Sequence, residues 1–258
     1  MKIKWLRRTK KIGLALGGGA ALGAAHIGVL KAFDELNIQI SFISGNSIGA
    51  FVATLFAFGK TWQEQEEISI GIKWLDVSKI SISKYGLLTN KKIGQKIVEA
   101  IGDAEFISSN IPLAIVASNL NSGKKIILKE GKVADAVMAS TAIPGVFKPV
   151  DIDGKLLVDG GLVENVPVSP LKKMGAELTI GVNLNARRSF KKPENWFGVL
   201  INSYYTLIDS LAKVHTRNAN LLIEPDLSSF SLIDTKNAKE LIEKGYEEAK
   251  KVLNDYFY

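Results

Sequence analysis

The sequence has no cysteine among its 258 residues. This absence excludes disulfide bridges, thiolate zinc sites and cysteine nucleophiles, and it fits a cytoplasmic location. Long apolar runs are also lacking, because no stretch of about 18 residues is purely apolar, so no membrane-spanning helix is predicted. Histidine occurs only twice, at His26 and His215. Any mechanism that needs a histidine base therefore has only these two residues to use.

The charge is unbalanced, with a formal net charge of +7. Part of the excess lies in a basic leader, residues 1–11, which holds six lysines and arginines, and part lies in Arg187, Arg188, Lys191 and Lys192. Each cluster fits either transient contact with anionic lipid headgroups or ordinary solvated charge. The rest of the chain is near neutral and carries no recognition motif, so nucleic acid is not expected as a partner.

Apolar runs with the character of strands alternate along the chain with segments of helical periodicity. This alternation predicts an α/β fold in which helices cover both faces of a mostly parallel sheet. No linker separates two domains, so residues 12–258 are expected to form one domain after the leader. We predict a helix and then an irregular loop in residues 61–88. The expected strands are 12–16, 40–43, 113–118, 125–129, 178–184 and 221–224, and residues 150–158 are expected to form a hairpin with an Asp-Gly turn. The expected helices are about 22–36, 50–58, 91–101, 133–140, 197–215 and 237–253.

The segment from Gly45 to Gly49 reads Gly-Asn-Ser-Ile-Gly, between an apolar strand and a run of small and apolar residues. This is the pattern of a nucleophile elbow, in which a strained turn exposes a serine hydroxyl at the end of a strand. Gly45 and Gly49 suit such a turn because a Cβ would block the close approach of backbones. The pattern therefore predicts Ser47 as a nucleophile, and the alternative is a serine that caps a helix.

A second glycine turn, residues 17–23, follows the first expected strand. It lacks the Gly-Lys-Ser/Thr ending of a P-loop. Neither frame of the turn fits the Gly-x-Gly-x-x-Gly fingerprint of dinucleotide-binding folds. The remaining interpretation is an oxyanion hole, because backbone amides at a helix N-terminus point toward developing negative charge. If the first two strands are neighbours, this turn and the serine elbow lie side by side.

Three further residues are candidates for acid–base chemistry. Asp159 ends a strand and precedes Gly160 and Gly161. It is either a simple turn former or a carboxylate of the site with backbone packed closely around it. His26 falls on the apolar stripe of its helix, so we expect it to be a core residue. His215 completes the chain order Ser47, Asp159, His215 that α/β-hydrolases use for a catalytic triad.

Together these segments resemble the patatin-like phospholipase family. The resemblance extends over about residues 12–253 and rests on four blocks in family order. The blocks are Leu14–Gly19 with His26–Leu30, Gly45–Gly49, Ala139–Gly145 and Asp159–Val168.

The resemblance implies a three-layer α/β/α fold and a lipid acyl hydrolase that needs no metal or cofactor. In such an enzyme Ser47 attacks the ester, Asp159 is its base, and the amides of Gly18, Gly19 and Ala20 bind the oxyanion. The implied substrates are phospholipids, glycolipids or other fatty-acyl esters. The sequence departs from the family pattern at Ala20, which stands at the third glycine, and at Leu22, which stands at the arginine.

Two alternatives stay open at this point. One is an esterase with a triad of Ser47, Asp159 and His215. The other is a lipid-binding relative without activity, weakened by the change at Leu22. The sequence leaves monomer and homodimer undecided, and it favours a cytoplasmic protein that meets the membrane surface transiently.

Overall fold

A computed structural model describes residues 10–70, 79–83, 86–187, 192–232, 234 and 236–258. Its main sheet has the strand order β10-β9-β1-β2-β5-β8-β7, and β6 pairs with β5. Pairing is parallel from β10 through β5 and antiparallel among β5, β6, β7 and β8. The mostly parallel sheet is therefore confirmed. Its strands are β1 (Ile12–Leu16), β2 (Ile40–Gly45), β5 (Leu113–Asn119), β6 (Lys125–Leu128), β7 (Val150–Ile152), β8 (Lys155–Asp159), β9 (Leu178–Val182) and β10 (Leu221–Ile223).

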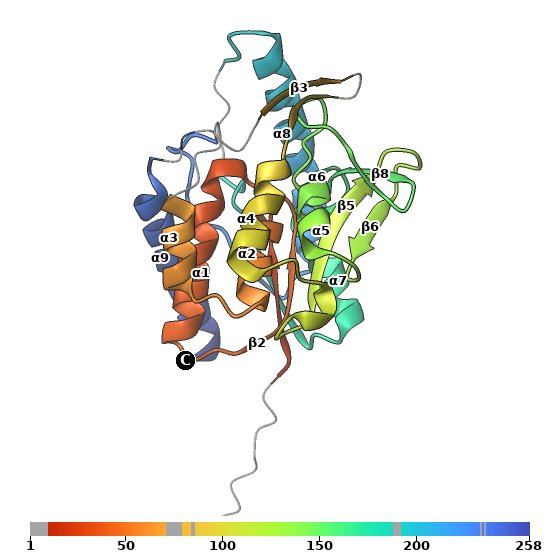
Figure 1. Cartoon of the computed structure of the whole chain (residues 1–258). Coiled ribbons are helices and arrows are strands. Elements are labelled where there is room, and N and C mark those ends of the chain that lie inside the picture. Colours follow the sequence, from red (N-terminus) through yellow and green to blue (C-terminus); the bar gives the residue numbers. More distant parts are fainter. Residues whose placement is uncertain (1–9, 71–78, 84–85, 188–191, 233, 235) are drawn as a thin grey trace, which may run out of the picture.

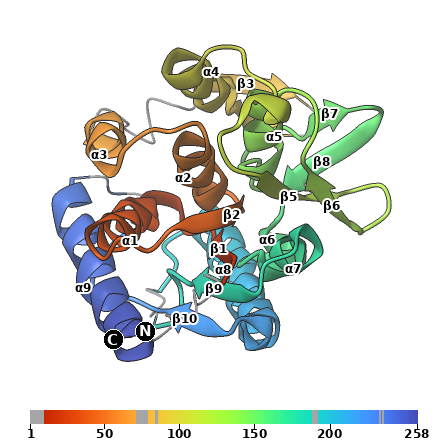
Figure 2. The same cartoon turned by 90° about the horizontal axis from the view of Figure 1, so that it is seen from below.

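Helices cover both faces of this sheet, as predicted (Figures 1 and 2). Viewed from below in Figure 2, α1, α2, α3 and α9 lie on one side of the central strands, whereas α6, α7 and α8 lie on the other. Leu14, Leu16 and Ile43 of the central strands are fully buried between the layers. The helices are α1 (Ala24–Glu35), α2 (Ile48–Ala57), α3 (Trp62–Ile70), α4 (Lys91–Ile101), α5 (Val133–Ser140), α6 (Gly161–Glu164), α7 (Val168–Met174), α8 (Trp196–His215) and α9 (Ala238–Phe257).

The structure corrects one prediction in residues 61–88. The irregular loop expected after α3 contains a small antiparallel hairpin, formed by β3 (Lys79–Ser83) and β4 (Gly86–Thr89). Alternating polar and apolar residues in Lys79–Ser83 carry a strand signal that is too short to stand out in the sequence. Of the basic leader, only Lys10 and Lys11 lie within the described residues. Arg188 and Lys191 of the second basic cluster also lie outside them. No helix in the described part of the chain has the length and apolar character needed to cross a bilayer.

The register of the sheet brings the two glycine turns together. Strands β1 and β2 run parallel, and their last residues, Leu16 and Gly45, are paired. The Asn46 amide extends this contact by donating to the Leu16 carbonyl oxygen at 3.1 Å. On the other side of β2, strand β5 pairs with both β2 and β8, and Ala117 stands opposite Asp159. One edge of the sheet therefore carries the glycine turn, the serine elbow and the aspartate.

His26 is a core residue, as the sequence predicts. It is fully buried in α1, and its Nε2 lies 2.7 Å from the carbonyl oxygen of Gly17, so its ring ties the helix to the glycine turn. Burial disfavours the charged ring and lowers the pKa of His26 from 6.5 to about 4, although the bond to Gly17 acts in the opposite direction. The neutral form is therefore the form that the fold accommodates.

This neutral histidine predicts a loss of stability in acid. In the unfolded chain His26 takes up a proton below about pH 6.5, whereas the folded protein resists protonation down to about pH 4. Between these values His26 binds more protons in the unfolded state, so its contribution lowers the free energy of unfolding by about 3 kcal/mol as the pH decreases. Proton uptake by the carboxyl of Asp159 acts in the opposite direction over about the same range, and it is common to the two proteins compared below. Urea denaturation of wild type and His26→Gln across this range measures the difference. A wild-type loss no larger than that of the variant would contradict the prediction.

Candidate active site

Ser47 lies at the turn between β2 and α2 in a strained backbone conformation. Its φ is 53° and its ψ is −127°, which non-glycine residues rarely adopt. The flanking glycines permit this turn. A Cβ on Gly49 would lie 2.1 Å from the Leu16 carbonyl oxygen, and one on Gly45 would lie 2.5 Å from the Cα of Ala50. The side chain of Ser47 makes no capping hydrogen bond to α2, so the alternative of a simple helix cap loses its support.

Ser140, at the end of α5, fixes the backbone of the elbow. Its hydroxyl oxygen accepts a hydrogen bond from the Ser47 amide at 2.8 Å and lies 2.7 Å from the carbonyl oxygen of Val116 in β5. Ser140 is fully buried, so these contacts are shielded from water. The elbow is thus held from α5 and β5 as well as by its own strand and helix.

Asn46 and Asn165 form a buried bridge between the elbow and the glycine turn. The Nδ2 of Asn46 donates to the Oδ1 of Asn165 at 3.1 Å, and the Gly18 amide lies 3.2 Å from the same oxygen. Neither asparagine was predicted from the sequence to have a role. Asn46 lies directly before Ser47, and Asn165 lies six residues after Asp159. Their place inside the two blocks that carry the candidate catalytic residues was the one sequence feature that could have indicated a role.

Asp159 lies at the end of β8, almost completely buried, with 2% of its surface exposed. Burial raises the pKa of its carboxyl from 3.8 to about 6, while hydrogen bonding from Gly161, Ser47 and Asn46 limits the rise. The Gly161 amide donates to Oδ1 at 2.8 Å. The structure therefore brings Ser47 and Asp159 together, and it gives the aspartate a pKa at which a carboxylate can act as a base near neutrality.

The following glycines and a tyrosine enclose this carboxylate. A Cβ on Gly160 would lie 2.4 Å from the carbonyl oxygen of Val116, and one on Gly161 would lie 2.8 Å from the Cδ1 of Ile208. Tyr204 of α8 also interacts with Asp159. Burial of the phenol, and then the negative charge of Asp159, raise the pKa of Tyr204 well above 10. The Tyr204 hydroxyl makes no well-aligned hydrogen bond to any described residue. The sequence predicts the helix that carries Tyr204, but not its contact with Asp159.

The glycine turn packs directly against the nucleophile. A Cβ on Gly18 would lie 3.1 Å from the Cβ of Ser47. The Gly18 amide, however, faces Asn165, whose backbone oxygen is 3.3 Å away. Within the described residues, the amides of Gly19 and Ala20 have no hydrogen-bond acceptor. Of the three amides named for an oxyanion hole, these two are available in this conformation.

Ala20 adopts a left-handed conformation, with a φ of 49°. An L-residue with a Cβ pays about 1 kcal/mol or more for this conformation, and glycine does not. We therefore expect Ala20→Gly to raise the free energy of unfolding by about 1 kcal/mol, measured by urea denaturation. Ala21→Gly is the matched control, because Ala21 has no positive φ and should lose stability instead. An equal effect of both changes would contradict the role of backbone strain.

Two other residues named from the sequence lie in different surroundings. Leu22 is almost fully buried in the main apolar core, so the position of the family's arginine is filled here by a core side chain. His215 ends α8, half-buried, and its Nδ1 has no hydrogen-bond partner among the described residues. The groups that set the pKa of Asp159 do not include His215.

Two solved structures share this fold over almost the whole chain. VipD from Legionella pneumophila has a TM-score of 0.60 and 15% sequence identity over 96% of this chain and 67% of its own. Full-length ExoU from Pseudomonas aeruginosa, in complex with SpcU, has a TM-score of 0.53 and 15% identity over 96% of this chain and 53% of its own. At this identity the likeness concerns the fold.

Proteins with similar sequences identify the family. An uncharacterized NTE family protein of Mycobacterium tuberculosis is 37% identical over 180 residues, which cover 68% of this chain and 49% of the relative. Lysophospholipase NTE1 of Coccidioides immitis is 24% identical over 279 residues, covering 95% of this chain and 18% of the relative. The chain thus spans half or less of these relatives. The family model for patatin-like phospholipases matches residues 14–172. This chain belongs to the patatin-like phospholipase family.

Proposed function

We propose that this protein hydrolyses the carboxylic esters of lipids, as a phospholipase A-type or lysophospholipase-type acyl hydrolase with Ser47 and Asp159 as its catalytic dyad. The family membership supports the class of reaction, and the relatives include proteins named lysophospholipases. The observation that carries the proposal is the contact between a strained, uncapped Ser47 and a buried Asp159 whose pKa is about 6. A hydroxyl with an adjacent base is the arrangement that nucleophilic catalysis requires.

In the first step the Ser47 hydroxyl attacks the ester carbonyl carbon while Asp159 accepts its proton. Because Gly161 donates to Oδ1 of Asp159, the other carboxylate oxygen is the one expected to take the proton. The amides of Gly19 and Ala20 would stabilise the negative charge on the substrate oxygen. The Gly18 amide would join them only by leaving Asn165. Asp159 then protonates the departing alcohol, and an acyl ester remains on Ser47.

In the second step water attacks the acyl ester with Asp159 as base, and the fatty acid is released. No histidine is needed for either proton transfer. The same carboxyl accepts and returns the proton, which a pKa of about 6 suits better than the unperturbed value of 3.8.

The test is release of p-nitrophenol from p-nitrophenyl esters, combined with labelling by a fluorophosphonate probe, which reacts with activated serines. We expect turnover and labelling by wild type, and we expect His215→Ala to retain both. Loss of activity in a folded His215→Ala variant would favour the triad over the dyad. A folded wild type that neither turns over esters nor takes the label would favour a lipid-binding protein without activity.

A further inference from the structure

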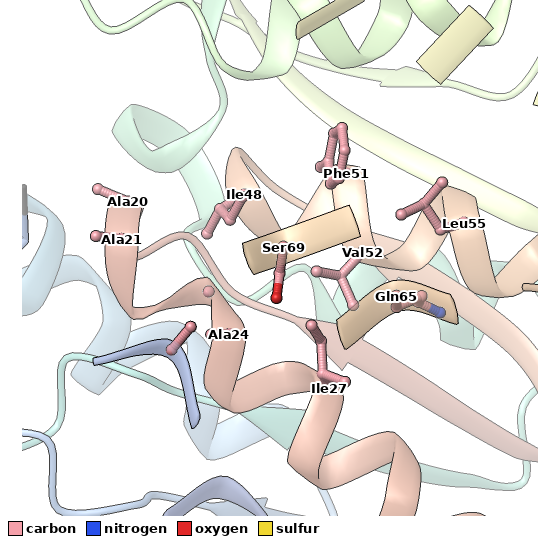
Figure 3. A pocket seen from close by; sticks show the side chains of 12 residues that line it. Ala20, Ala21, Ala24, Ile27, Ile48, Phe51, Val52, Leu55, Gln65 and Ser69 are labelled. Atoms are coloured by element: carbon pink, nitrogen blue, oxygen red, sulfur yellow. The ribbon is translucent and has the colours of Figure 1, made fainter. Parts of the chain in front are cut away.

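A narrow apolar pocket opens beside the proposed oxyanion hole, between α1, α2 and α3 (Figure 3). At one end it is bordered by Ala20 and by Ile48, the residue that follows Ser47. From there it runs along the side of α2 that carries Val52 and Leu55. Its free volume is about 40 Å³, which corresponds to about three water molecules or a short hydrocarbon segment.

Gln65 of α3 gives the far end of this pocket a polar group. Figure 3 places its side chain at the end of the pocket that carries Val52 and Leu55, away from Ala20 and Ala21. Gln65 is buried, with 1% of its surface exposed, and its Nε2 donates to the Lys60 carbonyl oxygen at 3.1 Å. This bond fixes the orientation of the amide, since the reverse orientation would set two oxygens against each other. The Oε1 of Gln65 has no hydrogen-bond partner among the described residues.

We propose that this pocket receives the acyl chain of the substrate and that Gln65 limits the length of the chain. The inference rests on the proposed function, because it assumes a carbonyl carbon at Ser47 and an oxyanion at Gly19 and Ala20. A substrate held in this way places one of its substituents at Ile48 and Ala20, where the pocket begins. Apart from Gln65 and Ser69, the lining consists of alanine, glycine, isoleucine, valine, leucine and phenylalanine, and the Ser69 hydroxyl already donates to the Glu66 carbonyl oxygen at 2.8 Å. This lining suits a hydrocarbon better than a polar headgroup.

The limit arises because Gln65 closes the far end of the pocket, where its Oε1 is shielded from solvent. A short chain stays within the existing free space and leaves Gln65 in place. A longer saturated chain must push the Gln65 side chain aside and break its hydrogen bond to the Lys60 carbonyl oxygen without offering a replacement, which weakens binding by about tenfold. Short and medium acyl chains are therefore the preferred substrates, and chains that reach α3 are disfavoured.

The test compares kcat/KM for p-nitrophenyl butyrate and p-nitrophenyl octanoate in wild type and in Gln65→Leu. Leucine is similar in size and has no hydrogen bond to Lys60 to lose when a chain pushes it aside, so we expect the octanoate-to-butyrate ratio to rise by about tenfold. Gln63→Leu is the matched control, because Gln63 is exposed on the same helix. Its ratio should equal that of wild type.

A second variant keeps the inference testable if Gln65→Leu is poorly folded. Ala24→Phe fills the pocket from α1, and it should lower the octanoate-to-butyrate ratio below the wild-type value. Reaction rates with butyl and octyl fluorophosphonates should follow the same order, because they report the same pocket without turnover. Unchanged ratios in folded Gln65→Leu and Ala24→Phe, with turnover that still depends on Ser47, would overturn the chain-length role alone. Absence of any Ser47-dependent turnover or labelling would overturn the proposed function and this inference together.

Discussion

Replacing Ser47 with alanine is expected to lower kcat/KM for ester hydrolysis by about 10⁴-fold or more. The change removes the atom that forms the acyl ester, and the neighbouring hydroxyl of Ser140 cannot substitute for it. Ser140 is fully buried, and its oxygen is already engaged with the Ser47 amide and Val116. Initial rates with p-nitrophenyl butyrate at several enzyme concentrations measure the effect.

Ser210→Ala is the control for this experiment, because Ser210 is exposed on α8 and, among the described residues, its hydroxyl donates only to the Thr206 carbonyl oxygen of the same helix. It should retain wild-type turnover. The free energy of unfolding of Ser47→Ala should fall by only about 1 kcal/mol, because the positive φ at residue 47 is unchanged and only the hydrogen bond of the hydroxyl to Asp159 is lost. A Ser47→Ala protein that retains more than about 1% of wild-type turnover would remove the serine from the mechanism.

Replacing Asp159 with asparagine should lower kcat by about 10³-fold, the usual contribution of a general base. The same variant should be more stable at pH 7. In the folded protein the Asp159 carboxyl has a pKa of about 6, against 3.8 for an exposed aspartate, so its ionised form destabilises the fold. The neutral amide avoids this cost, which is about 3 kcal/mol for a shift of this size. Activity assays and urea denaturation at pH 7 measure the two effects.

The raised pKa of Asp159 also determines how stability and activity depend on pH. Above about pH 6 the folded protein carries an ionised Asp159 and bears its full cost. As the pH falls from about 6 to 3.8, the folded state takes up this proton before the unfolded state, so the destabilisation is relieved. The activity of wild type should fall over the same range, because the protonated carboxyl is no longer a base. A profile of kcat/KM that stays flat down to pH 4.5 would argue against Asp159 as the base.

The main features of the fold and the elbow followed from local sequence. Ser47 could be predicted as the nucleophile because it has a glycine two residues before it and another two residues after it. Between an apolar strand and an apolar helix, few structures other than a nucleophile elbow need this pattern. His26 could be placed in the core because its helix repeats apolar residues with helical spacing, and this placement is confirmed. These predictions depend on neighbours in sequence, which is where periodicity and turn chemistry carry information.

The features that the sequence did not predict depend on contacts between distant segments. Asn165 lies 147 residues from Gly18 and 119 from Asn46, and no local pattern indicates that the three meet. For the same reason the engagement of the Gly18 amide could not be foreseen, and neither could the approach of Tyr204 to Asp159. The hairpin of β3 and β4 was missed because its strands are short.

Intact-protein and peptide mass spectrometry after reaction with an alkyl fluorophosphonate at pH 7 tests the nucleophilic role of Ser47 most directly. We expect one adduct per chain on the peptide that contains Ser47, with slower labelling of Asp159→Asn and none of Ser47→Ala. An adduct on another residue, or no adduct on a folded protein, would contradict a nucleophilic Ser47 activated by Asp159.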